Sequence, residues 1–130
     1  MQIEALDHLV LTVADIPATV TFYETHLGMT AISFDAGETS PRHALKFGSQ
    51  KINLHQAGAE FEPKSSRPTP GSADLCFLVS GTIDDWMRHL SDAGIAIEIG
   101  PVARTGATGP LMSLYVRDPD LNLIELSTSG

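Results

Sequence analysis

Asp7-His8-Leu9-Val10-Leu11-Thr12-Val13 is a strand-like stretch, and a similar one, Ala73-Asp74-Leu75-Cys76-Phe77-Leu78-Val79, begins about 66 residues later. Each copy is followed by a helix-like stretch that ends at a glycine, 19–27 before Gly28 and 83–93 before Gly94. Each half then closes on a strand with a polar residue between apolar neighbours, at Asn53 and at Glu125. Overlaying the halves pairs His8 with Asp74 and Asn53 with Glu125, which predicts an internal repeat.

The pattern predicts two tandem βαβββ modules, an α+β fold in which a curved mixed sheet surrounds a cleft and the helices lie outside. Asp15 and Thr82 are the expected N-caps of the two helices. We expect one domain, 1–130, with modules at 1–60 and 73–130 and a proline-rich connection at 61–72. The expected strands are 7–13, 29–34, 43–47, 51–56, 73–79, 95–99, 111–117 and 122–127, and the second helix is 82–93.

The composition narrows the function classes. The chain of 130 residues has 16 acidic and 8 basic residues, a formal net charge of −8, which argues against a nucleic-acid or anionic-membrane partner. A single cysteine, Cys76, excludes an internal disulfide. We expect that thiol to pack in the core or line a cavity. No apolar run reaches the roughly 18 residues of a membrane span, and no signal-peptide pattern follows Met1, so a cytoplasmic protein is expected.

Alternation along the strands predicts which side chains share the cleft. That set is rich in potential metal ligands: His8, Asn53, His55, Asp74, Cys76, Glu125 and Ser127. Imidazole nitrogen and carboxylate oxygen suit a first-row divalent metal, so His8, His55, Asp74 and Glu125 are the candidate ligands. A histidine on a strand is also commonly a hydrogen-bonded core residue, and this remains the alternative for His8 and His55.

Other residues are candidates for catalysis and for substrate binding. The stretch 104–110 combines glycines, threonines and one cation, which suits an approaching anion, although a plain hairpin connection has the same composition. Tyr115 and Arg117 share a strand face. The catalytic candidates are therefore Glu125, His55 and Tyr115, and the substrate-binding candidates are Asn53, Arg104, Thr105 and Arg117.

The stretch Tyr115-Val116-Arg117-Asp118-Pro119-Asp120-Leu121-Asn122-Leu123-Ile124-Glu125-Leu126, with Asp7-His8 and Leu27-Gly28-Met29, resembles the vicinal oxygen chelate superfamily, also called the glyoxalase/bleomycin resistance/dioxygenase fold. Residues 47–56 and Arg104-Thr105-Gly106 are similar to a subgroup known as glyoxalase domain-containing or virulence-associated proteins. The resemblance implies a divalent metal (Ni, Zn, Mn or Fe), a small substrate with adjacent oxygens, and a homodimer.

Carried over by position, the family's first metal histidine is His8 and its final glutamate is Glu125. Two positions depart from the family pattern: Asn53 stands where glyoxalase-type enzymes have glutamate or glutamine, and Asp74 where they have a second histidine. Our own hypothesis is a rearranged site of His8, His55 and Glu125, with Asp74 as a fourth ligand or beside the site.

Three functions follow from these expectations. The first is a metal-dependent lyase, isomerase or transferase that acts on a small oxygen-chelating molecule. The second is a metal-free small-molecule binding protein, like the antibiotic-binding members, which the residues at positions 53 and 74 favour. The third is an extradiol-type dioxygenase, which is weakened because Asp74 replaces the second histidine that such a site needs.

Overall fold

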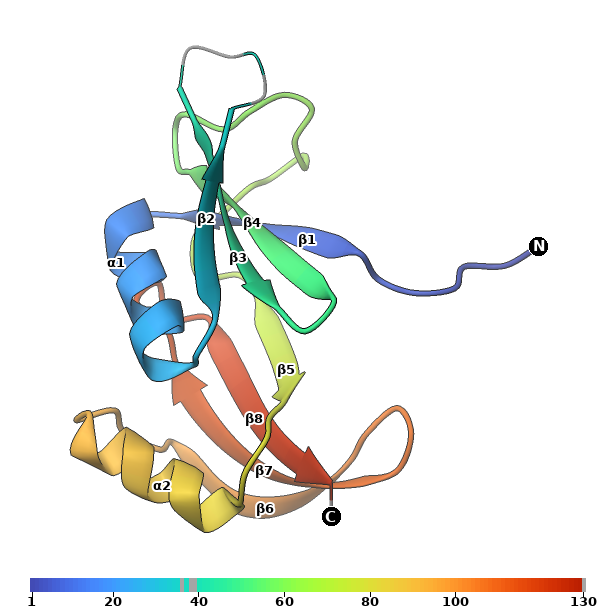
Figure 1. Ribbon diagram of the computed structural model, residues 1–130, viewed down its shortest axis with the longest axis vertical. Coiled ribbons are helices and arrows are strands. Elements are labelled where there is room, and N and C mark those ends of the chain that lie inside the picture. The colour runs from blue at the N-terminus through green and yellow to red at the C-terminus, as the bar shows by residue number, and fades with distance from the viewer. Residues whose placement is uncertain (36, 38–39, 130) are drawn as a thin grey trace. The chain divides into compact units, whose positions relative to one another are not determined.

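The computed structural model describes residues 1–35, 37 and 40–129 and divides into two compact units, Met1–Pro70 and Gly71–Gly130. Both units have the predicted βαβββ order, and each builds its own four-stranded mixed sheet (Figure 1). The α+β class and the two tandem modules are therefore confirmed. Among the described residues, no helix is both long and apolar enough to cross a membrane.

Unit 1 contains a sheet in the order β1-β4-β3-β2, in which β1 runs parallel to β4 and the other pairs are antiparallel. Asp15 caps the first helix, as predicted, because its carboxylate accepts a hydrogen bond from the Ala18 amide at 3.3 Å. The helix begins at Ile16, three residues before the predicted start, and continues into a wide π-helical segment. The elements are β1 (His8–Val13), α1 (Ile16–Thr21), η1 (Phe22–His26), β2 (Thr30–Phe34), β3 (Arg42–Phe47) and β4 (Gln50–Gln56).

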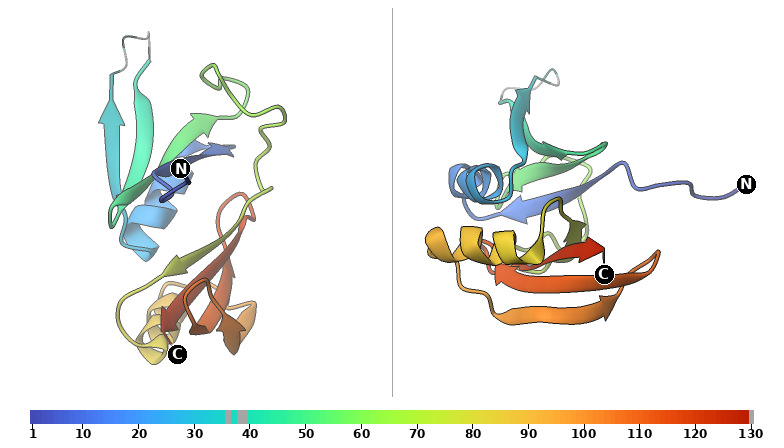
Figure 2. Two further views of the ribbon diagram at one scale, coloured as in Figure 1. Left: turned by 90° about the vertical axis from the view of Figure 1, so that its right-hand side faces the viewer. Right: turned by 60° about the horizontal axis from the view of Figure 1, so that its bottom comes forward.

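The helical segment of unit 1 lies beside its sheet (Figure 2), and buried side chains of both form the core of the unit. Strand alternation puts Leu11 and Val13 of β1 into this core, while His8, Val10 and Thr12 point to the other face. Tyr23 is fully buried on the helical side. The face of the sheet opposite the helix is consequently the one that carries polar side chains.

Unit 2 repeats this plan with a sheet in the order β5-β8-β7-β6. Thr82 caps the second helix, as predicted, by accepting the Asp85 amide at 3.1 Å. Leu90 of that helix and Ile124 and Leu126 of the last strand are buried between helix and sheet. The elements are β5 (Asp74–Leu78), α2 (Ile83–Asp92), β6 (Ile99–Thr105), β7 (Pro110–Arg117) and β8 (Leu123–Ser129).

One predicted strand is wrong. Strand β6 begins at Ile99, where the predicted strand 95–99 ends, and it pairs with β7 with a register shift between Ile99 and Val102. Pro101 fits there because β6 is an edge strand with an irregularity, where a missing amide hydrogen is tolerated. As a result, Arg104 and Thr105 lie in the strand and not in the predicted loop, which shortens to 106–109.

The strand registers confirm the overlay of the two halves. In unit 1, Val10 lies opposite Asn53, and in unit 2, Cys76 lies opposite Glu125. His8 and Asp74 each precede these positions by two residues, so they stand at the same place in their own modules. The repeat is therefore structural, down to the pairing of individual residues.

Candidate functional site

Glu125 is a hydrogen-bonded carboxylate on the sheet of unit 2. It lies on β8 between the buried Ile124 and Leu126, so its own side chain projects from the face that does not pack against α2. The Ser113 hydroxyl donates to Glu125 Oε2 at 2.6 Å, and the Ser127 hydroxyl reaches the same oxygen at 3.3 Å. Both serines are completely buried, which fixes the carboxylate against a rigid support.

The serines belong to a short chain of hydrogen bonds. The two hydroxyl oxygens are 2.7 Å apart, and Cys76 Sγ lies 3.3 Å from Ser127 Oγ. A hydroxyl has a single proton to donate. Because Ser113 gives its proton to Glu125, the contact between the serines uses the Ser127 proton, which is shared between Ser113 Oγ and Glu125 Oε2. Both hydroxyl protons therefore point toward the carboxylate side of the chain.

This environment keeps Glu125 ionised. Burial raises the pKa of the carboxyl group, but hydrogen bonds from Ser113, Tyr115, Ser127 and Cys76 oppose burial, and the net pKa lies below the ordinary value of 4.5. Tyr115 is itself held by Arg104, whose Nε donates to the phenolic oxygen at 3.0 Å. A carboxylate with a lowered pKa is a good metal ligand and a weak general base.

The Cys76 thiol was expected to pack in the core or to line a cavity, and the first of these is wrong. The residue is exposed and does not pack in the core, because it shares the face of Glu125. Burial, with added repulsion from Glu125 and Asp74, raises the pKa of the thiol. Cys76 is therefore present as the protonated thiol at neutral pH, and this disfavours a nucleophilic role.

In unit 1, His8 is oriented by its neighbour in sequence. Its Nδ1 lies 2.8 Å from Asp7 Oδ2, and this hydrogen bond is the main reason that the pKa of Asp7 is lowered. A carboxylate only accepts hydrogen bonds, so Nδ1 carries a proton, and Nε2 is the ring nitrogen that remains for a metal when the ring is neutral. Histidines that bind metals are commonly oriented in this way by a carboxylate.

The register separates His55 from His8. His8 lies opposite Lys51 and His55 lies opposite Thr12, so the two histidines are four residues apart along the strands. This corresponds to about 13 Å at the usual strand rise. The distance is too long for both imidazoles to bind one metal ion, so the predicted arrangement of His8 with His55 does not fit. Across the described residues, no three His, Cys, Asp or Glu side chains gather closely enough to hold a metal.

The remaining candidates have varied surroundings. Asp74 is exposed and lies two residues along β5 from Cys76, the partner of Glu125, which is about 7 Å along the strand at the usual rise. Arg117 is engaged with Glu98 through two hydrogen bonds of 3.0 Å. Asn53 Oδ1 is buried and has no hydrogen-bond partner in the part of the chain that the structure describes. Thr105 is an exposed residue at the end of β6.

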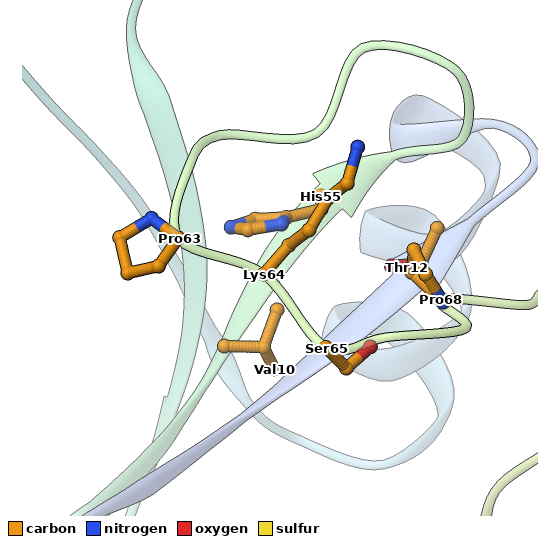
Figure 3. Close-up of a pocket in the computed structure, with 7 residues that line it drawn as sticks. All are labelled: Val10, Thr12, His55, Pro63, Lys64, Ser65 and Pro68. Carbon is orange, nitrogen blue, oxygen red and sulfur yellow. The ribbon is translucent and has the colours of Figure 1, made fainter.

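His55 instead lines a pocket within unit 1, which has a volume of about 440 Å³ (Figure 3). Val10, Thr12 and His55 form its floor on β1 and β4. Its other walls come from residues that follow β4, namely Pro63, Lys64, Ser65 and Pro68. Neither these residues nor Ser113 could be found from the sequence, because a proline-rich connection or a serine in a strand has no pattern that indicates a site.

Comparison with known proteins agrees with the fold. The family model described as Glyoxalase/Bleomycin resistance protein/Dioxygenase superfamily matches residues 5–126. Virulence protein STM3117 of Salmonella typhimurium is 60% identical over 127 residues, which are 98% of this chain and 85% of that protein. Its crystal structure matches with a TM-score of 0.94 at 58% identity and covers 100% of both chains. Glyoxalase domain-containing protein RDO1 of Mycosarcoma maydis is 56% identical over 128 residues, 98% of this chain and 70% of that protein.

More distant structures have the same fold and are named for different activities. They are 19 to 22% identical, have TM-scores from 0.66 to 0.76 and cover at least 93% of each chain. They are a lactoylglutathione lyase from Agrobacterium tumefaciens, the antibiotic-binding protein TnmS3 from Streptomyces, and the fosfomycin resistance protein FosX from Listeria monocytogenes with manganese(II). At this identity the match shows the fold alone. The family match over nearly the whole chain, together with the close relatives, establishes that this protein belongs to the glyoxalase/bleomycin resistance/dioxygenase superfamily.

Proposed function

We propose that the chain is a metal-dependent enzyme of lyase, isomerase or transferase type that acts on a small molecule with adjacent oxygens. The observation that carries the proposal is the state of Glu125. Two fully buried serines hold its carboxylate on the face that α2 leaves open, with a pKa below the ordinary value. Such an arrangement supports a fixed anionic ligand.

Imidazole nitrogen and carboxylate oxygen are atom types that a first-row divalent metal prefers. In the proposal, His8 supplies Nε2, whose direction is set by the bond to Asp7, and Glu125 supplies a carboxylate oxygen. Asp74 is the candidate third ligand, because it is an exposed carboxylate two residues along β5 from the partner of Glu125. When bound, the metal would polarise the substrate oxygens as a Lewis acid.

Two further residues receive roles that differ from the sequence hypothesis. Tyr115 donates toward Glu125 and accepts from Arg104, so we assign both residues to positioning of the carboxylate. The unpaired Oδ1 of Asn53 supports a substrate-binding role, because a buried acceptor without a partner is costly and a substrate donor would satisfy it.

The first test is the metal content of protein that is purified without added metal or chelating resin. We expect close to one divalent ion per site in the wild type and a loss of metal in both His8→Ala and Glu125→Gln. His89→Ala is the matched control, because His89 is an exposed histidine on α2 in the other unit from His8. Equal metal content in all four proteins would contradict the assignment of the ligands.

The second candidate function is metal-free binding of a small molecule, and the pocket of unit 1 favours it. This function would replace the first if no metal is retained after incubation with nickel, zinc, manganese and iron(II). For either function we propose a homodimer as the working form, as expected for the family. Light scattering on the purified chain would measure its mass directly.

A further inference from the structure

The residues that follow β4 cover one end of the sheet in unit 1. We call residues 57–70 the covering segment; it contains no helix or strand. The Ala57 amide donates to the Val13 carbonyl at 2.8 Å, which holds the start of the segment against β1. The Phe61 ring meets His55 edge-on at 5.6 Å, and the Arg42 guanidinium lies 4.3 Å from the centre of the same ring. The segment is thus fixed to the sheet by side chains from β3 and β4.

The pocket under the covering segment is lined by apolar residues and by neutral or basic polar residues. Its volume of about 440 Å³ lies toward the lower end of the roughly 300–1,000 Å³ that is usual for small-molecule sites. None of the seven lining residues is acidic, although the chain has 16 acidic residues. Four of the lining residues are polar, namely Thr12, His55, Lys64 and Ser65. Apolar contact comes from the other three residues, Val10, Pro63 and Pro68.

The charges around the pocket limit what it accepts. Lys64 Nζ lies 3.2 Å from Glu62 and 3.7 Å from Glu60, and Glu60 also interacts electrostatically with His55. The pair with Glu62 is exposed on both sides, at 36% and 73%, and such pairs contribute little and are easily rearranged, whereas the Glu60 side chain is only 9% exposed. Lys64 has three N–H donors, so it can bind a ligand oxygen while it keeps a glutamate partner. The surroundings therefore suit one anionic group and not a polyanion.

We propose that this pocket binds the end of the substrate that is remote from the metal, and that this end is a compact apolar group with a single carboxylate. The role rests on the proposed function, in which His8 binds the metal. His8 and Thr12 are on the same face of β1, four residues apart, which is about 13 Å at the usual strand rise. The substrate is accordingly an elongated small acid, with its adjacent oxygens at one end and its carboxylate at the other.

The test uses a probe that has the carboxylate but no metal-binding oxygens. Binding of 4-fluorophenylacetate is followed by ¹⁹F NMR and by amide chemical shifts in the presence of EDTA, so that metal does not contribute. We expect saturable binding in the millimolar range, which is usual for a ligand of this size. The shifts should be concentrated at Thr12, His55 and Ser65.

Two variants and one control locate the site. Ser65→Phe, at an exposed lining position, fills the pocket and should abolish binding. Lys64→Ala should weaken binding about fivefold or more through loss of a charge-assisted hydrogen bond. Lys46→Ala should have no effect, because Lys46 is an exposed lysine on β3 that does not line the pocket.

The proposal is overturned if the probe does not saturate, or if all three variants bind it equally well. Because the titration is run in EDTA, its outcome is independent of the metal analysis. Metal retention without probe binding would remove the pocket proposal and leave the proposed function. Probe binding without metal retention would instead identify the pocket as the site of the metal-free binding protein.

Discussion

Ser113→Ala tests the argument that the hydroxyl chain sets the charge state of Glu125. The variant removes a 2.6 Å hydrogen bond to the carboxylate and leaves the weaker 3.3 Å contact from Ser127. A hydrogen bond to a charged group contributes about 1.5–3 kcal/mol, and the half-buried position of Glu125 places this one at the lower end, about 1.5 kcal/mol. We therefore expect a higher pKa for Glu125 and a lower free energy of unfolding at neutral pH.

The direction of the pH dependence follows from the lowered pKa. A carboxyl group whose pKa is lower in the folded protein stabilises the fold above its unfolded value, here 4.5, and this stabilisation is lost as the pH falls through the folded value. The stability difference between wild type and Ser113→Ala should thus be largest near pH 7 and shrink below about pH 4. Urea unfolding at pH 7 and pH 3.5 measures this difference, and ¹³C NMR of the carboxyl group measures the pKa itself.

Ser129→Ala is the matched control for this experiment. Ser129 is an exposed serine on the same strand as Ser127, two residues further along, and its replacement should change stability by less than about 0.5 kcal/mol. The reasoning would be refuted if Ser113→Ala left the pKa of Glu125 unchanged. It would also fail if the stability difference were the same at both pH values, because the serine would then act only through packing.

Two further predictions concern the frame that holds the site. Thr82→Ala removes the cap that accepts the Asp85 amide and should lower the free energy of unfolding by about 1 kcal/mol, as measured by urea titration. Gly71→Ala should cost more than about 1 kcal/mol and more than Gly94→Ala in the same assay. Both glycines have positive φ, but only at Gly71 would the new Cβ meet a backbone atom, the Asp120 carbonyl oxygen at 2.5 Å; equal losses would show that backbone strain alone decides.

Much of the fold was predictable because its signals are local. Alternation along β1 assigns its two faces from sequence alone, and the registers agree with that assignment. The caps at Asp15 and Thr82 were predictable for the same reason, since each contacts an amide only three residues away. The equivalence of Asn53 and Glu125 needed just one further assumption, that a repeated pattern folds into a repeated module.

The errors arose where tertiary pairing decides the structure. Residues 95–99 alternate like a strand, but most of them do not pair with β7, whereas the stretch through Pro101 does because it occupies a sheet edge. His55 was placed near the metal because its face was correct, but the register that sets its distance from His8 is not visible in the sequence. Ser113 gave no signal, since its importance depends on lying opposite Ser127 across two strands.

The repeated frame explains how two similar modules can do different work. Position 55 in unit 1 corresponds to position 127 in unit 2, because each lies two residues beyond the Asn53 or Glu125 position. In unit 2 this position is a small hydroxyl residue, which leaves room for a hydrogen-bond chain that fixes a carboxylate. In unit 1 it is an imidazole, which Phe61 covers and which forms the floor of a pocket. In the proposed function, the second module would supply the carboxylate for the metal, and the first module would supply His8 and the pocket for the substrate. His55→Ser should therefore impair probe binding without a loss of metal. Ser127→His should impair metal retention without a loss of probe binding.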